Sequence, residues 1–160
     1  MPRVAIIMGS QSDTKTVQQT VMILNDFGVE YEARVLSAHR TPNELAAYVD
    51  SLEEKGVKVI IAAAGGSAAL AGVIASRSLL PVVGIPIEIK ELKGLDSLLS
   101  TVQMPPGVPV ACMSIGDWGA RNAALFALSI LALEDKAIRN KLDSYRRELA
   151  HKVRKAKISL

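Results

Sequence analysis

The sequence predicts an α/β fold: a single three-layer α/β/α sandwich around a parallel sheet of about five strands. Short runs of apolar, often β-branched residues recur along the chain, and stretches with helical periodicity separate them. Hydrophobic residues make up 49% of the chain but aromatic residues only 4%, which favours tight layers of Ala, Val, Ile and Leu. At 160 residues the chain fits one domain, 1–160, that can bury a sizeable core.

The expected strands are short apolar runs. Residues 4–8, Val-Ala-Ile-Ile-Met, are apolar throughout, which is typical of a strand buried on both faces of a parallel sheet. The connection that carries Asp96, Ser97 and residues 103–107 is expected to be a polar, proline-containing loop with no metal-ligand pattern. Later strands are expected at residues 31–36, 57–61, 81–85 and 108–115.

Helices are expected between the strands. The helix after residue 13 ends at Gly28, which suits a helix C-terminus, and Pro42 suits the first turn of the next one. The first helix places apolar side chains on one face, at Val17, Val21, Leu24 and Phe27. Further helices are expected at residues 42–55, 68–78 and 120–133.

We expect two parts within the domain: an α/β core of residues 1–133 and a C-terminal helix within residues 134–160. Residues 123–133 are apolar all round a helix, so we expect burial on every side, which in a domain this small calls for contact with another subunit. The C-terminal helix carries one apolar stripe, which fits either its own domain or a neighbouring subunit. We favour a closed homo-oligomer in which this helix packs on a neighbour. The stripe consists of Ile138, Leu142, Tyr145, Leu149 and Val153.

Composition argues against several classes of partner. The net charge is +3, but the basic residues gather near the C-terminus, where Asp143 and Glu148 interrupt them and Tyr145 is the only aromatic residue, so we expect no nucleic-acid partner. The single Cys112 excludes an intramolecular disulfide and fits a reducing cytoplasm. The chain shows no signal-peptide pattern and no apolar run near the roughly 20 residues that span a bilayer, so we expect a soluble cytoplasmic protein without a membrane partner.

The first candidate site is the loop of residues 9–13, Gly-Ser-Gln-Ser-Asp, between a predicted strand and a helix N-terminus. Free backbone N–H groups and the helix dipole favour a phosphate there, and the Ser10 and Ser12 hydroxyls add donors. Asp13 suits ribose hydroxyls. The alternative is that Ser12 or Asp13 only caps the helix. The loop has neither the Walker nor the G-x-G-x-x-G pattern, so ATP and NAD binding have no support.

The second candidate site is residues 37–42, Ser-Ala-His-Arg-Thr-Pro, at the carboxyl end of a strand, where α/β proteins bind ligands. His39 can exchange a proton near neutral pH, while Arg40 keeps its charge and suits phosphate or carboxylate. A lone histidine is often structural, but the position beside Arg40 favours a general acid/base. His151 on the charged C-terminal helix is expected to be a surface residue.

A third turn of small residues, Gly65, Gly66 and Ser67, follows another strand. It permits a ligand to approach the backbone closely, although tight strand-to-helix packing needs the same residues. The paired carboxylates, Cys/His clusters and Ser/His/Asp arrangements of other enzyme classes are not evident.

Four segments, in order and over nearly the whole chain, resemble the N5-carboxyaminoimidazole ribonucleotide mutase family, the phosphoribosylaminoimidazole carboxylase catalytic subunit. They are residues 4–13 (Val-Ala-Ile-Ile-Met-Gly-Ser-Gln-Ser-Asp), 37–42, 94–100 (Gly-Leu-Asp-Ser-Leu-Leu-Ser) and 102–110 (Val-Gln-Met-Pro-Pro-Gly-Val-Pro-Val).

This resemblance implies a flavodoxin-like sheet, a homo-octamer, and no metal or organic cofactor. It implies a substrate that is an aminoimidazole ribonucleotide derivative, with CO2 as an intermediate and His39 as the proton-transferring catalytic residue. The phosphate and ribose are expected among Ser10, Ser12, Asp13, Ser37 and Arg40. The full set of expected substrate-binding residues is Gly9, Ser10, Ser12, Asp13, Ser37, Ala38, Arg40, Gly65, Gly66 and Ser67.

One loop departs from the family pattern. Bacterial mutases usually have Gly-Gly-Ala-Ala-His-Leu-Pro-Gly after the third strand, whereas residues 65–72 are Gly-Gly-Ser-Ala-Ala-Leu-Ala-Gly, so Ala69 and Ala71 replace His and Pro. Related carboxylases that use free CO2 usually have Gly-Arg-Ser-Asn-Ala-Leu-Ser-Gly, which Ser67 and Ala69 match. Those carboxylases also tend to have lysine at the position of Arg40.

Three functions are therefore weighed. Arg40 and residues 102–110 favour a mutase that interconverts N5-carboxyaminoimidazole ribonucleotide and 4-carboxy-5-aminoimidazole ribonucleotide in de novo purine biosynthesis. Ser67 and Ala69 favour a direct carboxylase of aminoimidazole ribonucleotide. The altered loop also leaves open a non-catalytic or divergent nucleotide-binding relative.

Overall fold

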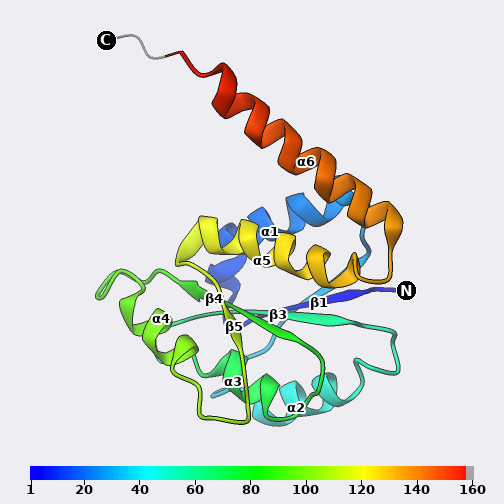
Figure 1. The fold of residues 1–160 in the computed structure, drawn as a ribbon. Coiled ribbons are helices and arrows are strands. Elements are labelled where there is room, and N and C mark those ends of the chain that lie inside the picture. The colour runs from blue at the N-terminus through cyan, green and yellow to red at the C-terminus, as the bar shows by residue number, and fades with distance from the viewer. Residues whose placement is uncertain (158–160) are drawn as a thin grey trace.

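The computed structural model describes residues 1–157, and its centre is a five-stranded parallel sheet in the order β2-β1-β3-β4-β5 (Figure 1). The predicted flavodoxin-like parallel sheet is confirmed. The strands are β1 (Val4–Met8), β2 (Tyr31–Val35), β3 (Val59–Gly65), β4 (Val82–Ile87) and β5 (Ala111–Cys112). The helices are η1 (Gln11–Asp13), α1 (Thr14–Phe27), α2 (Pro42–Asp50), α3 (Leu70–Ala75), α4 (Leu95–Val102), α5 (Gly116–Leu131) and α6 (Lys136–Lys155).

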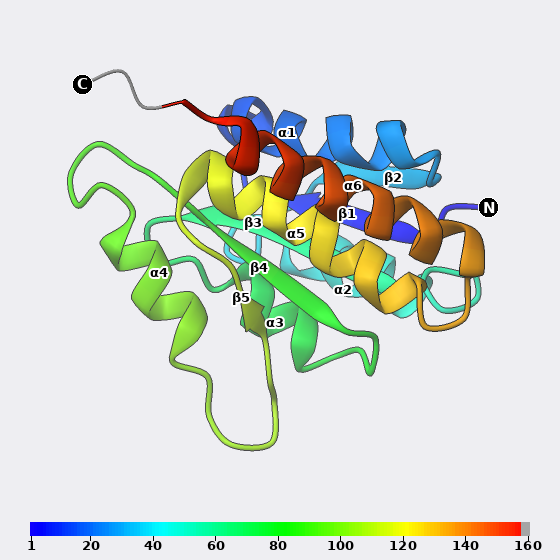
Figure 2. The ribbon, with the colours of Figure 1, turned by 45° about the horizontal axis from the view of Figure 1, so that its top comes forward.

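Helices cover both faces of the sheet, with α1 and α5 on one side and α2 and α3 on the other (Figures 1 and 2). Side chains alternate along each strand, so neighbouring residues enter opposite layers. Ile6 and Ile61 join the core under α1 and α5, while Ile7 and Ile60 join the core under α2 and α3. All four are fully buried, as expected for strands that are apolar throughout.

The strand order makes β1, an inner strand, the point at which the chain changes direction across the sheet. β1 pairs with β2 on one side and with β3 on the other, so the direction in which the chain winds reverses at β1. Ligands of open α/β sheets bind beyond the carboxyl ends of the strands at such a switch point. The loops after β1, β2 and β3 therefore meet where a ligand site is expected.

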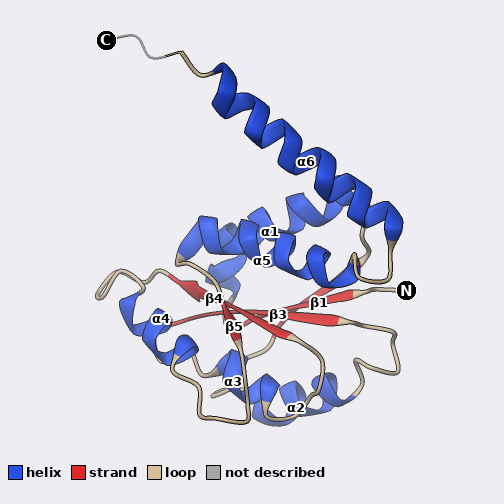
Figure 3. Cartoon of the chain, viewed as in Figure 1, coloured by secondary structure: helices blue, strands red, loops and turns tan. Residues whose placement is uncertain are grey.

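The prediction of a polar loop around Asp96 and Ser97 is wrong, because these residues begin the helix α4 (Figure 3). Two polar residues of α4 face inward: Ser97 is fully buried, with its hydroxyl 2.8 Å from the Ile87 carbonyl oxygen. Thr101, also buried, donates its hydroxyl to the Ser97 carbonyl at 2.7 Å. Most apolar residues of the helix are exposed instead, so its buried face is polar, unlike that of an ordinary surface helix.

Several element bounds also differ from those predicted. β5 is two residues long rather than 108–115, because it pairs only with Val83 and Gly84 at the edge of the sheet. α2 ends at Asp50 and α3 covers only Leu70–Ala75, with turns completing the segments that were expected to be helical. α5 begins earlier than predicted, at Gly116.

α5 is not buried on every side within this chain. Its inner face is rich in alanine, which lets the helix approach α1 and β4 closely, whereas Phe126 on its outer side is 42% exposed. The expected all-round burial includes contact with another subunit, so it stays a prediction. Although α5 is apolar, no helix within residues 1–157 has the length and hydropathy to cross a membrane.

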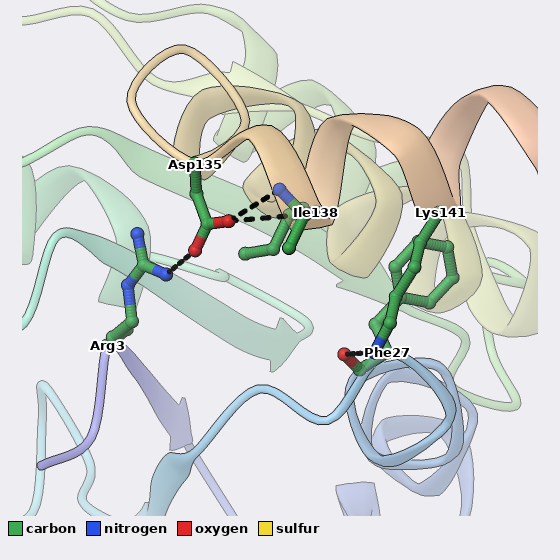
Figure 4. Close-up of polar contacts among 6 residues, drawn as sticks. Arg3, Phe27, Asp135, Ile138 and Lys141 are labelled. Atoms are coloured by element: carbon green, nitrogen blue, oxygen red, sulfur yellow. Dashed lines mark hydrogen bonds and ion pairs between the residues drawn. The ribbon is translucent and has the colours of Figure 1, made fainter.

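α6 is held at its first turns and then extends away from the sheet (Figures 1 and 4). Asp135 caps it, accepting hydrogen bonds from the Ala137 and Ile138 N–H groups at 3.0 and 3.2 Å. The same carboxylate pairs with Arg3 at 2.7 Å, and Lys141 donates to the Phe27 carbonyl at 2.8 Å. The start of the apolar stripe is buried at Ile138 and Leu142, whereas its end is exposed, at Leu149 and Val153.

Candidate active site

A cavity of about 360 Å³ lies at the carboxyl edge of the sheet, between the loops that follow β1, β2 and β3. Every site residue predicted from the sequence lines it except Ser67, whose side chain is exposed. The lining consists of Gly9, Ser10, Ser12, Asp13, Ser37, Ala38, His39, Arg40, Ala64, Gly65, Gly66, Ala68, Ala69, Leu70 and Ile89.

The loop after β1 is shaped by hydrogen bonds among its own side chains. The Ser12 N–H donates to Ser10 Oγ at 3.4 Å, and the Ser10 N–H donates to Asp13 Oδ2 at 3.0 Å. The Ser12 hydroxyl lies 3.0 Å from Ser10 Oγ. These bonds form a reciprocal cap for the short helix η1, with Ser10 as the N-cap residue. The alternative that Ser12 or Asp13 caps the helix is wrong in this form, because Asp13, at the N-cap of α1, makes no side-chain cap hydrogen bond to that helix.

Asp13 is 6% exposed, and burial raises the pKa of its carboxyl above the ordinary value. Hydrogen bonds from the Ser10 backbone and the Ser12 side chain, together with the charge of Arg40, partly oppose this rise. Asp13 therefore lies in the cavity as a desolvated acceptor whose charge is only partly compensated. A hydroxyl donor from a ligand would stabilise its ionised form.

The loop after β2 is closed by Thr41. The Ser37 N–H donates to Thr41 Oγ1 at 2.8 Å, and the Thr41 N–H donates to the Ser37 carbonyl at 3.0 Å. This turn brings Arg40 across to the neighbouring loop, where its Nη2 donates to the Gly9 carbonyl at 2.9 Å. Within residues 1–157, Arg40 forms no ion pair, so its charge remains available to an anion.

His39 lies at the top of the same turn and lines the cavity with an exposed side chain. No residue in the described part of the chain hydrogen-bonds to its imidazole or pairs with it. Both ring nitrogens are therefore available for hydrogen bonds to a bound ligand.

The turn after β3 serves packing as well as access. A Cβ on Gly65 would lie 2.8 Å from Ile89 Cγ2, so any larger residue at position 65 would displace Ile89. Gly66 has φ +64°, a left-handed conformation that favours glycine. The tight-packing explanation of this turn therefore holds at Gly65, with Ile89 as the packed group.

Sequence reasoning missed the apolar part of the cavity. Three of the missed lining residues, Ala68, Ala69 and Leu70, directly follow the glycine turn. Their position in the sequence, next to a predicted site loop, could have predicted that they line the cavity. Ile89 follows β4, whose loop carried no recognised motif, and only the fold brings it to the cavity.

Comparison with known proteins identifies the family of this chain. The sequence profile of the family described as AIR carboxylase matches residues 3–152. The N5-carboxyaminoimidazole ribonucleotide mutase of Pyrococcus abyssi is 53% identical over 149 residues, covering 93% of this chain and 84% of that protein. The mutase of Saccharolobus solfataricus is 51% identical and covers 96% of both chains, and that of Bacillus subtilis is 52% identical, covering 91% of this chain and 90% of its own.

A solved structure shares the whole architecture. The crystal structure of Treponema denticola PurE superimposes with a TM-score of 0.87 at 31% sequence identity, covering 96% of this chain and 94% of that one. The similarity therefore covers nearly the whole fold.

Proposed function

The chain belongs to the AIR carboxylase family, and we propose that it interconverts N5-carboxyaminoimidazole ribonucleotide and 4-carboxy-5-aminoimidazole ribonucleotide, the mutase reaction of de novo purine biosynthesis. The observation that carries this proposal is the cavity at the carboxyl edge, which combines an unpartnered imidazole, an unpaired guanidinium and a desolvated carboxylate. The related proteins of about 50% identity that are named mutases supply the choice of reaction.

The polar loops are proposed to hold the ribose phosphate. Arg40 offers a charged donor to the phosphate, and the hydroxyls of Ser10, Ser12 and Ser37, which line the same cavity, are further donors. Asp13, a buried acceptor in the lining, is proposed to accept from a ribose hydroxyl. Gly9, Ala38, Gly65 and Gly66 line the cavity and complete the proposed contacts, and Ser67 is omitted because it lies outside.

His39 is proposed to be the general acid and base. Decarboxylation of the substrate breaks the N5–carboxyl bond, leaves its electron pair on nitrogen and requires a proton there. The C4 carbon of aminoimidazole ribonucleotide then attacks CO2 and loses its own proton. The net reaction moves one carboxyl group and one proton, and His39 is the titratable cavity residue that no other described group holds in place.

Direct carboxylation of aminoimidazole ribonucleotide with free CO2 is the second candidate. Ala69, which lines the cavity, matches the carboxylase pattern and favours it. Ser67, the other matching residue, is exposed outside the cavity, so its identity carries little weight for the CO2 source.

We also propose that the protein is a homo-oligomer, with an octamer as the expected form, acting in the cytoplasm. Leu95, Leu99 and Val102 form an exposed apolar stripe on α4, and each is about half exposed in the single chain. Leu149 and Val153 continue the α6 stripe beyond the α/β core of residues 1–133. Covering these surfaces with other copies of the chain would remove them from water.

The test of the proposed reaction supplies wild-type protein with N5-carboxyaminoimidazole ribonucleotide in CO2-depleted buffer, and in parallel with aminoimidazole ribonucleotide and bicarbonate. We expect fast formation of the C4-carboxylated isomer from the carbamate only. Fast turnover of the second mixture alone would make the protein a direct carboxylase, and turnover of neither would contradict both assignments.

A further inference from the structure

Ile89 stands between the active-site cavity and a second hollow in the surface. The second hollow, of about 590 Å³, lies between the start of α1, the loop after β4 and the start of α5. Its other walls include Lys15, Lys90 and the 80% exposed Trp118. Among the described residues, Ile89 is the only one that lines both spaces.

The side chain of Ile89 is seated on the glycine turn of the cavity. Its Cγ2 atom occupies the space that a Cβ on Gly65 would need, at 2.8 Å, and its Cδ1 atom lies 3.6 Å from the corresponding position on Gly66. The flanking Glu88 and Lys90 are exposed, whereas Ile89 is partly buried. Ile89 therefore turns inward between two solvated charges and forms part of the cavity wall.

On the cavity side, Ile89 belongs to an apolar wall. Ala64, Ala68, Ala69 and Leu70 line the same cavity, and none of them offers a side-chain hydrogen-bond donor or acceptor. The polar groups come instead from the loops after β1 and β2. The apolar wall suits a small neutral molecule without hydrogen-bond donors, such as CO2. The side chains of this wall have no polar group that would hold a water molecule in its place.

We propose that Ile89 is a positioning residue that retains CO2 in the active site between the two halves of the mutase reaction. This inference rests on the proposed function. After the N5–carboxyl bond has broken and nitrogen has taken a proton, CO2 is a free molecule with no covalent bond to the substrate or the protein. Until C4 attacks it, only the cavity walls prevent its escape and the entry of water. Ile89 lies on the apolar side of this space and also lines the neighbouring hollow.

The experiment follows the carboxyl carbon. Wild-type protein receives N5-carboxyaminoimidazole ribonucleotide labelled with 13C in the carboxyl group, in buffer containing excess unlabelled bicarbonate, and the label in the product is measured by mass spectrometry. Wild type should retain nearly all of the label. Ile89→Ala should retain severalfold less and should release free aminoimidazole ribonucleotide. Ile89→Val keeps Cγ2 on Gly65 but loses Cδ1 near Gly66, and should give an intermediate retention.

Two variants serve as matched controls. Leu92→Ala removes an exposed apolar side chain from the same loop but lines neither space, and Trp118→Ala alters only the outer hollow. Both should retain the label as wild type does. Wild-type retention in Ile89→Ala, or in Ile89→Val if the alanine variant does not fold, would overturn the inference. Absence of product from wild type would instead contradict the proposed function, so the two failures are distinguishable.

Discussion

An arginine lies near an aspartate both at the carboxyl edge of the sheet and at the base of α6, but only the second pair forms an ion pair. At the base of α6, Arg3 and Asp135 form a 2.7 Å ion pair, and the Arg3 hydrogen bond holds the pKa of Asp135 below its ordinary value. At the carboxyl edge, Arg40 donates to a backbone carbonyl instead, and burial raises the pKa of Asp13.

This difference distinguishes charges that neutralise each other within the fold from charges that can interact with a ligand. Arg3 and Asp135 satisfy each other and fasten α6 to the core, as Figure 4 shows, which leaves little of their charge for a ligand. Arg40 and Asp13 share a cavity without forming an ion pair, and His39 beside them has no partner among residues 1–157. Pairing, rather than residue type, distinguishes the candidate site from the structural contact.

The largest expected effect comes from His39→Asn. Asparagine keeps much of the shape of the side chain but cannot transfer a proton near neutral pH, so we expect kcat to fall about 10²- to 10⁴-fold. Because His39 is exposed and unpartnered, unfolding and substrate binding should change little. Steady-state kinetics and thermal unfolding measure both, and activity that survives in this variant would contradict the assigned role.

Arg40→Lys should act on substrate binding. The ammonium keeps the charge but loses the planar fork, and loss of a charge-assisted hydrogen bond corresponds to an increase in KM of about 10- to 100-fold. Arg3→Lys is the matched control on the structural side and should leave KM unchanged. Equal increases in KM in the two variants would remove the proposed distinction between the regions.

Asp135→Ala should affect stability alone. It removes the α6 cap and the Arg3 ion pair, so we expect the melting temperature to fall by about 2–6 °C. The cavity lies at the other end of the strands, so kcat/KM of the folded enzyme should be unchanged. Calorimetry with assays at a temperature well below the transition checks both quantities.

The smallest effect is a difference in pH dependence. The raised pKa of Asp13 means that its ionisation costs stability as pH rises through the range just above the ordinary aspartate value of 3.8. The lowered pKa of Asp135 means that its contribution is present above that value and is lost as pH falls through its folded pKa. Relative to wild type, Asp13→Asn should therefore gain stability between low and neutral pH, and Asp135→Asn should lose it. Urea unfolding at several pH values would show slopes of the same sign if this account were wrong.

The polar half of the site could be predicted because it follows from chain order. Asp13 comes just after the apolar strand β1, and His39 and Arg40 come just after β2. The carboxyl ends of parallel strands meet at one edge. The buried strands could also be predicted, because an uninterrupted apolar run of this length is typical of a strand in a parallel sheet that helices cover on both faces.

The remainder depends on contacts between distant segments. Ile89 reaches the cavity only because β4 lies next to β3, and no local pattern marks it. The helix α4 was missed because Ser97 and Thr101 are satisfied by backbone carbonyls inside the fold, so its buried face is polar. The Arg3–Asp135 pair joins residues 132 positions apart and has no sequence signature.

The most direct test of the central claim uses the two histidines of the chain in one experiment. His39 lines the cavity, while His151 lies exposed on α6 and acts as an internal control. With 13C-labelled histidine and the His39→Asn variant for assignment, NMR spectra are recorded during titration with aminoimidazole ribonucleotide. We predict that the His39 signal shifts as the ligand binds and that the His151 signal does not move. Saturable binding that leaves the His39 signal unchanged would contradict the claim that this cavity is the active site.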